Sequence, residues 1–159
     1  MKMPLAASLV MIAASGSLFF GSCKKKDDSP SKSALLKASP WKYKEAGIDL
    51  DNNGSGETPI PPGTLQSYDL DNTVTFQTDT TGIVDEGPTK FPASNPQTST
   101  FKYTFNSSTN VINFSTAVFA GISGDAKVLE LSATQLKISK AVPITGVPAP
   151  LTVVVTLVH

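Results

Sequence analysis

Two alternating stretches joined by a polar turn decide the fold, and residues 98–115 carry them as TSTFKYTFNSSTNVINFS. In the first stretch, Phe101, Tyr103 and Phe105 occupy every second position, with polar or charged residues between them. This period of two is typical of a half-buried β-strand, and residues 111–115 repeat it. The Asn, Ser and Thr residues between the stretches favour a tight connection. The sequence therefore predicts a β-hairpin here.

Six further segments carry the same strand signals, which brings the predicted total to about eight. They are 41–44, 73–78, 83–86, 127–132, 135–140 and 151–158. One short helix is predicted from Ala34 to Ala38, with Ser33 as its N-cap. A long polar loop is predicted from residue 47 to residue 63. The class is therefore all-β, and sequential hairpins favour a small up-and-down antiparallel β-barrel, with a β-sandwich as the alternative.

The composition narrows the classes of function. The chain of 159 residues has 13 basic residues, all of them lysine, and 13 acidic residues, so its formal net charge is zero. A neutral chain without arginine has no bulk field for nucleic acid and no bidentate clamp for phosphate, which excludes a nucleic-acid partner. The only cysteine is Cys23, so the domain has to be stable without disulfide bonds.

The N-terminal segment has the pattern of a secretory signal. Lys2 precedes an apolar run from Leu5 to Phe20, and two small residues stand before Cys23. The run is shorter than the roughly 20 residues of a bilayer span. The predicted organisation is a signal peptide at 1–22, a flexible tether at 23–33 and one domain at 34–159. A cleaved signal with an incidental free cysteine is the alternative.

The residues around the cysteine resemble two signals of bacterial lipoproteins. Phe20-Gly21-Ser22-Cys23 is similar to a lipobox, which implies acylation of Cys23 and an anchor in a membrane. Lys26-Asp27-Asp28 resembles the surface-export signal of Bacteroidota lipoproteins. The resemblance implies an outer-membrane lipoprotein that is exposed at the cell surface. A solvated charged tether is the alternative for Lys26-Asp27-Asp28.

The domain resembles the lipocalin-like domains of Bacteroidota surface lipoproteins. A short helix, a strand that opens with Trp41, and a meander of about eight strands carry the resemblance, together with the runs at 45–51, 68–76 and 82–87. It implies a barrel that binds a small hydrophobic ligand. Ser39 stands where the Gly-x-Trp signature of lipocalins has glycine, and Tyr68 and Phe91 stand where many relatives carry cysteines.

The strongest metal candidate lies in the predicted loop. Asp49, Asp51 and Asn53, followed by Gly54, match the first half of a calcium loop, in which oxygen ligands alternate before a glycine. The twelfth position should be a bidentate glutamate but is Ile60, which leaves Glu57 as the nearest substitute. A weak calcium site is one hypothesis. A plain turn is the other, because Asp, Asn and Gly form turns without a metal.

Aromatic residues form the second candidate site. On the inner faces of a barrel they would either line a cavity for an apolar ligand or fill the core. The set is Trp41, Tyr43, Phe76, Phe101, Tyr103, Phe105 and Phe114. A third candidate is Thr80, because Asp79-Thr80-Thr81 is similar to the O-glycosylation motif of Bacteroidota.

The sequence predicts no enzyme. The only histidine is His159, expected on a frayed chain end, and no thiol nucleophile or zinc-ligand set remains. Two hypotheses of function are left. In the first, a lipid-anchored barrel binds a small apolar molecule or a glycan fragment through its mouth and its aromatic lining. In the second, a structural or accessory surface lipoprotein has a filled core and acts through a protein partner.

Overall fold

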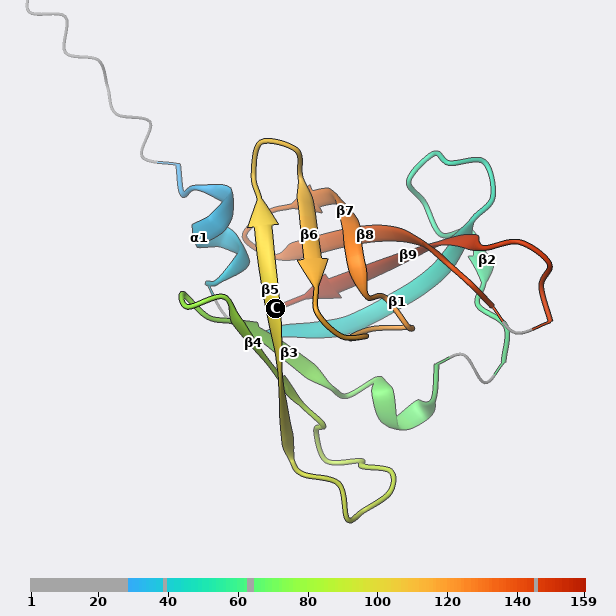
Figure 1. The fold of residues 1–159 in the computed structure, drawn as a ribbon, viewed down its shortest axis with the longest axis horizontal. Helices are drawn as coiled ribbons and strands as arrows, with labels where there is room; N and C mark the ends of the chain where they lie inside the picture. The colour runs from blue at the N-terminus through green and yellow to red at the C-terminus, as the bar shows by residue number, and fades with distance from the viewer. Residues whose placement is uncertain (1–28, 39, 63–64, 145) are drawn as a thin grey trace, which may run out of the picture.

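The computed structural model describes residues 29–38, 40–62, 65–144 and 146–159, and it shows a β-barrel with a short helix at one end (Figure 1). The elements are α1 (Lys32–Leu36), β1 (Trp41–Asp49), β2 (Thr58–Pro59), the 3-10 helix η1 (Ser67–Asp69), β3 (Thr73–Phe76), β4 (Thr81–Asp85), β5 (Thr98–Asn106), β6 (Val111–Phe114), β7 (Gly124–Leu131), β8 (Gln135–Val142) and β9 (Leu151–Val158). None of the described helices is long and apolar enough to cross a bilayer.

The barrel is closed by its first and last strands. β1, β3 and the strands up to β9 follow one another as antiparallel neighbours, and β9 returns to pair with β1 from Lys42–Val158 to Asp49–Thr152. β2 is an additional short strand on the other edge of β1. The predicted all-β, up-and-down antiparallel barrel of eight strands is therefore confirmed, and the sandwich alternative is wrong. Closure satisfies the backbone of both edge strands, which would otherwise be open to aggregation.

The helix begins two residues earlier than predicted. Ser31, not Ser33, is the N-cap, and its Oγ accepts a hydrogen bond from the backbone N–H of Ala34 at 3.1 Å. Both serines are adequate caps, and a helix of five residues has no periodic pattern that would fix its start. The burial of Leu36, which is fully shielded from solvent, selects the register.

The C-terminal residue is held against the barrel, so the expectation of a frayed end is wrong. The ring of His159 stacks on that of Trp41 at 3.7 Å between centroids, and its Nδ1 lies 3.0 Å from the carbonyl oxygen of Pro40. The Trp41 Nε1–H donates to the carbonyl oxygen of Leu36 at 2.8 Å. The indole therefore ties α1 and the end of β9 to the start of β1.

The first strand is longer than predicted and carries a loop on its outer side. β1 runs on to Asp49, where a loop from Gly47 was expected, because β9 pairs with it along its full length. The chain then turns back, and Gly56 passes against Gly47. Val154 and Thr156 on the outer face of β9 are only 3% exposed, so both faces of this strand are covered.

Gly47→Ala is expected to destabilise the protein, because the added Cβ would lie 2.1 Å from the carbonyl oxygen of Gly56. Backbone cannot yield as a flexible side chain does, so the returning loop has to move. We expect a loss of about 1–3 kcal/mol in the free energy of unfolding, measured by urea denaturation. Ser55→Ala, which adds no atom at the contact, is the control and should stay within about 0.5 kcal/mol of the parent. Equal stability of Gly47→Ala and the parent would contradict the contact.

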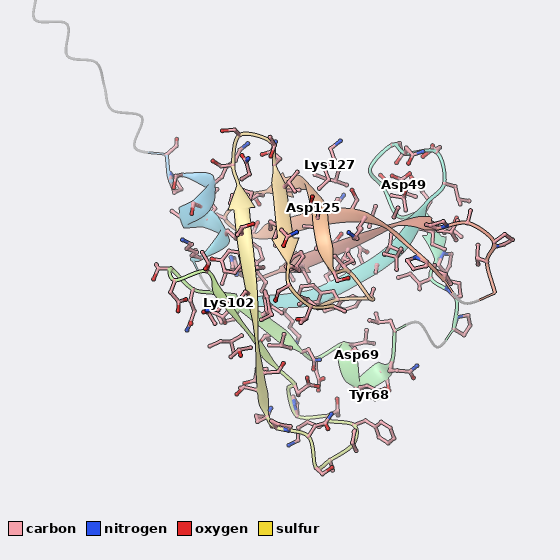
Figure 2. The ribbon with its side chains drawn as sticks, in the orientation of Figure 1. Asp49, Tyr68, Asp69, Lys102, Asp125 and Lys127 are labelled. Carbon is pink, nitrogen blue, oxygen red and sulfur yellow. The ribbon has the colours of Figure 1, made fainter. Side chains whose placement is uncertain are left out.

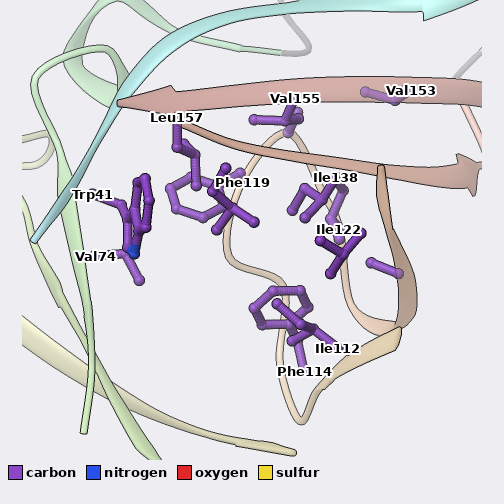
Figure 3. Packing of buried hydrophobic residues seen from close by; sticks show 14 of the residues in the cluster. Trp41, Val74, Ile112, Phe114, Phe119, Ile122, Ile138, Val153, Val155 and Leu157 are labelled. Carbon is purple, nitrogen blue, oxygen red and sulfur yellow. The ribbon is translucent and has the colours of Figure 1, made fainter. Parts of the chain in front are cut away.

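The barrel interior is filled with apolar side chains. Val74, Ile112, Leu136, Ile138 and others reach the interior from the strands and are fully shielded from solvent. The connection between β6 and β7 adds two more residues, Phe119 and Ile122, which lie among the strand residues in Figure 3. Segment 117–123 is therefore neither a strand nor a helix, but a loop folded into the barrel.

Candidate functional site

The seven aromatic residues predicted from the sequence all belong to the core or pack against it. Five of them are at most 5% exposed, and Tyr43 and Phe105 are half-buried beside them. Phe76 is central to the group: its ring lies 4.9 Å from that of Tyr103 and 6.0 Å from that of Phe101, both in edge-on geometry. Such contacts fill the space between strands β3, β5 and β6 rather than leaving it open.

The hydroxyl of Tyr103 has a partner inside this group. It donates to the carbonyl oxygen of Gln77 at 2.6 Å, which satisfies its polar end at the turn between β3 and β4. Burial raises the pKa of the Tyr103 hydroxyl above its ordinary value, and the nearby carboxylate of Asp79 raises it further. Tyr103 therefore stays neutral at physiological pH and acts as a structural hydrogen-bond donor.

A cavity lies where the barrel wall is incomplete. On one edge of β1, Trp41 and Lys42 pair with β3, and Gly47 and Ile48 pair with β2. Residues 43–46 between them have no partner on that edge among the described strands. The segment 65–72, with η1 in its middle, covers this gap, and a cavity of about 140 Å³ remains between it and the barrel interior.

We call this space the side cavity and define it by its lining. Its walls are Tyr43, Leu65, Asp69, Asn72, Val84 and the turn at 118–121. Of the seven predicted ligand-lining aromatics, Tyr43 is the one that contributes to this wall. Figure 2 shows Asp69 beside Tyr68 in the lower half of the view, whereas the tip of the β5–β6 hairpin lies at the top.

The polar side chains of the side cavity offer mostly acceptors. Asp69 accepts a hydrogen bond from the backbone N–H of Gln66 at 2.9 Å through Oδ2, and its Oδ1 has no hydrogen-bond partner among the described residues. The amide nitrogen of Asn72 faces the carbonyl oxygens of Glu86 at 2.8 Å and Tyr68 at 3.2 Å, which leaves its amide oxygen as an acceptor. No lysine is found among the described residues that line the cavity.

The inner wall of the cavity is a strained turn. The N–H of Ile122 donates to the carbonyl oxygen of Phe119 at 2.7 Å, and both residues between them have positive φ, +43° for Ala120 and +78° for Gly121. Positive φ at two successive central positions is the geometry of a type I′ turn, in which Gly, Asn or Asp is preferred. A buried alanine at the first position costs energy that a glycine would avoid.

The loop between β1 and β2 brings the predicted calcium ligands together in part. One carboxylate oxygen each from Asp49, Asp51 and Glu57 lies within 4.8 Å of the others. The amide nitrogen of Asn53 bridges two of these carboxylates: it donates to Asp51 Oδ2 at 3.0 Å and to Glu57 Oε1 at 2.9 Å. Asn53 therefore acts as a donor in this arrangement, and calcium binding stays a prediction.

Asp49 itself has a structural role at the end of β1. It is 5% exposed, and its two oxygens accept backbone hydrogen bonds from Asn53 at 3.1 Å and Gly54 at 2.8 Å. Burial by itself would raise the pKa of the Asp49 carboxyl, but the hydrogen bonds from Gly54 and Asn53 outweigh it and hold the pKa below its ordinary value. The carboxylate therefore fixes the loop in its returning path.

Acid is expected to destabilise the protein through carboxylates of this kind. Four of them have a pKa below the ordinary value, namely Asp49, Asp71, Asp79 and Asp85. For Asp85 the cause is a side-chain hydrogen bond from Gln97 at 2.7 Å and a backbone one from Gly87. A depressed folded-state pKa contributes stability that is present above the unfolded value of about 3.9 and is lost as the pH falls through the folded value.

The urea midpoint should therefore change little between about pH 7 and pH 5 and fall steeply below about pH 4. Asp85→Asn should remove part of this slope, because the residue can no longer take up a proton. Gln97→Leu should reduce the contribution of Asp85 to the acid slope, because it removes the main hydrogen-bond donor to the Asp85 carboxylate and keeps the carboxyl group itself. An Asp85→Asn variant with the full acid slope of the parent would contradict this assignment.

A second, more open space lies on the outer face of the barrel. The loop after β1 and the outer surfaces of β7, β8 and β9 enclose a groove of about 610 Å³, lined in part by Asp49, Asn53, Asp125, Lys127, Leu129 and Thr152. Asp125 and Lys127 lie on β7, and Figure 2 shows them on the same upper side of the barrel as the loop that begins at Asp49. We call this space the outer groove. Its lining mixes charged, polar and apolar side chains, and the side-chain amine of Lys127 has no hydrogen bond or ion pair with any described residue.

The remaining sequence candidates lie apart from these two spaces. Thr80 is exposed in the turn between β3 and β4 with φ of +66°, and its glycosylation stays a prediction. Tyr68 and Phe91, at the positions where the resemblance implies cysteines, stack at 5.4 Å between ring centroids. Cys23 and the residues Lys26, Asp27 and Asp28, together with the predicted signal peptide, lie outside the described residues.

Comparison of the chain with protein-family models, with curated proteins and with solved structures gives no match.

Proposed function

We propose that this protein is a lipid-anchored lipoprotein of the lipocalin-like kind, exposed at the surface of the outer membrane, which binds a small molecule without catalysing a reaction. The lipobox-like residues before Cys23 support the anchor, and Lys26-Asp27-Asp28 supports surface exposure. The eight-stranded barrel is compatible with a ligand-binding role of this kind.

The side cavity is the observation that carries the proposal. The aromatic residues that would line a wide central pocket pack against one another instead, and Phe119 and Ile122 occupy the space beside them. At the gap in the wall, by contrast, about 140 Å³ is left between Tyr43, Val84 and the segment 65–72. A cavity of roughly this size is enough for a ligand as large as benzene. The ligand is therefore expected to be small and to sit in the barrel wall.

The position of α1 agrees with an anchor at Cys23. The helix begins at Lys32, and the intervening residues span at most about 30 Å when fully extended. Figure 1 shows α1 at one end of the long axis and the β1–β2 loop toward the other. In the proposed arrangement the α1 end lies near the membrane, and the side cavity and the outer groove remain accessible from the medium.

Metabolic labelling and protease shaving of intact Bacteroidota cells test the anchor and the location separately. The full-length chain should take up a radioactive fatty acid, and Cys23→Ala should lose it. Replacing Lys26, Asp27 and Asp28 together by alanine should keep the label but protect the protein from protease added outside the cells. Labelling of Cys23→Ala would contradict the anchor, and shaving of the triple variant would contradict the export signal.

The outer groove favours a second candidate function, that of an accessory protein that acts through a protein partner. It is an open space of about 610 Å³, and its lining mixes charged, polar and apolar side chains. A photo-crosslinking residue at Leu129, which lines the groove, should then give one discrete adduct in cells. The same residue placed at Ser108, in the exposed turn between β5 and β6, should give none. Equal crosslinking from both positions would contradict this function.

A further inference from the structure

We propose that the side cavity binds a small ring-bearing molecule with a protonated amine, whose ammonium group is held by Asp69 and whose ring lies against Val84, Val118 and Phe119. This inference rests on the proposed function, because it names the ligand class of the same cavity. It differs from the small hydrophobic ligand that the sequence predicts.

The size of the cavity limits the ligand. A volume of about 140 Å³ is close to the roughly 150 Å³ of an engineered apolar cavity that takes up benzene. Fatty acids, sterols and haem are far larger than this. A single six-membered ring with a short side arm is therefore the largest ligand that the cavity holds without movement of its walls.

The polar groups of the lining decide which charge the ligand carries. Asp69 brings a carboxylate, Oδ1 of which has no hydrogen-bond partner among the described residues, and Asn72 brings an amide oxygen, because two carbonyl oxygens occupy its amide nitrogen. Both are acceptors, and neither a lysine of the lining nor an ion pair in the described part of the chain neutralises Asp69. A ligand that donates hydrogen bonds and carries a positive charge therefore matches the wall better than a neutral or anionic one.

The apolar side of the cavity is the part that would hold the ring of the proposed ligand. Leu65, Val84, Val118 and Phe119 are hydrophobic, and the first three offer flat aliphatic surface beside the aromatic ring of Phe119. The ring of Tyr43 lies in the same wall, and the face of an aromatic ring attracts an ammonium group. The two halves of the lining thus separate an apolar region from an acceptor region, as an aryl amine requires.

The strained turn gives a reason for the alanine at position 120. Glycine would adopt the φ of +43° at lower cost, yet it would leave the cavity without a methyl group in its inner wall. Strain that persists beside a cavity points to a role of that wall in function. A ligand packed against the turn is expected to stabilise it, since the ligand binds the native conformation only.

Four probes of one shape separate charge from hydrophobicity. They are benzylamine, benzyl alcohol, toluene and benzoate, titrated into the full-length, ¹⁵N-labelled chain in non-ionic detergent at pH 7, with probe and micelles alone as the blank. Chemical shifts of the backbone amides of Leu65, Asp69, Val84 and Gly121 report binding. We expect benzylamine to bind about tenfold or more tightly than benzyl alcohol, toluene to bind more weakly still, and benzoate to give no shift.

Two variants assign the effect to the proposed groups. Asp69→Asn keeps an acceptor for the N–H of Gln66 but removes the charge, and it should bring the affinity for benzylamine down to that for benzyl alcohol. Val84→Phe should fill the cavity and abolish the shifts for every probe. Asp125→Asn, in the outer groove, is the matched control and should bind benzylamine as the parent does. Thermal unfolding checks that each variant is folded.

The outcomes separate the ligand class from the site. If all uncharged probes bind, Val84→Phe abolishes their binding, and benzylamine has no advantage that Asp69→Asn removes, the amine preference is overturned and the cavity remains the site. If no probe binds, or if Val84→Phe binds them like the parent, the side cavity is overturned as a binding site, and the proposed function with it.

Discussion

Replacing Phe76 by alanine is expected to lower the free energy of unfolding by about 3–5 kcal/mol. Phe76 is 1% exposed, and its ring contacts those of Phe101, Tyr103 and Phe114, so its removal leaves a cavity between β3, β5 and β6. Urea denaturation of the full-length chain measures the loss. The result distinguishes a filled barrel from a hollow one, in which truncation of a lining ring would mainly change ligand affinity.

Two other phenylalanines are matched controls for this substitution. Phe105→Ala removes the same atoms from a half-buried position on the same strand as Phe101 and should cost clearly less. Phe91 is 67% exposed, and Phe91→Ala should cost under about 1 kcal/mol, since only its contact with Tyr68 is lost. A loss below about 1 kcal/mol for Phe76→Ala would show that the interior is not packed as described.

Trp41→Ala is expected to cost a similar amount, about 3–5 kcal/mol, for a different reason. The indole is fully shielded from solvent, and the ring of His159 stacks on its face. Its Nε1–H donates a hydrogen bond to the carbonyl oxygen of Leu36. Its loss therefore releases α1 and the chain end as well as leaving a void. Urea denaturation gives the total, and hydrogen exchange at Leu35 and Leu36 should show whether the helix is released.

Single-contact variants divide the effect of Trp41 into parts. Trp41→Phe keeps an aromatic ring but removes the N–H, which leaves the carbonyl oxygen of Leu36 unpaired and should cost about 1–3 kcal/mol. His159→Ala removes only the stacked ring and should cost about 0.5–1.5 kcal/mol. A Trp41→Phe variant as stable as the parent would contradict a structural role for the hydrogen bond.

The strand pattern of the sequence was sufficient for the architecture. Alternation in residues 98–115 and in the last segment marked strands whose order along the chain is also their order in the sheet. Closure followed from the same physical need, since an open meander would leave two free edges. The all-β class, the barrel and the position of each main hairpin were therefore predictable from local signals.

The strand boundaries and the side cavity depend on contacts between residues that are far apart in the sequence. β1 extends to Asp49 because β9, about 100 residues later, pairs with it, and no local pattern indicates this. The side cavity arises because β2 and β3 pair with separate parts of β1, so its wall joins Tyr43, Asp69 and the turn at 118–121. Among the predicted lining residues Tyr43 alone pointed to the cavity, because aromatic character marks a core position but not an empty space beside it.

In the acidic loop between β1 and β2, the local sequence pattern predicted which side chains lie together but not which groups they bond. The spacing of Asp49, Asp51 and Glu57 correctly indicated that their carboxylates lie close together. It did not indicate that backbone N–H groups satisfy Asp49 or that the amide of Asn53 lies between the other two. Asp, Asn and Gly bond their own backbone so readily that the same pattern serves a turn and a metal loop.

The proposed ligand site lies in the barrel wall and not in the barrel interior. Nuclear Overhauser effects between bound benzylamine and ¹³C-labelled Ile, Leu and Val methyl groups of the full-length chain test it most directly. We expect contacts to the methyl groups of the side cavity, which are those of Leu65, Val84 and Val118. Contacts to the interior methyl groups of Ile112, Ile138 and Val155, or contacts to neither set, would contradict it.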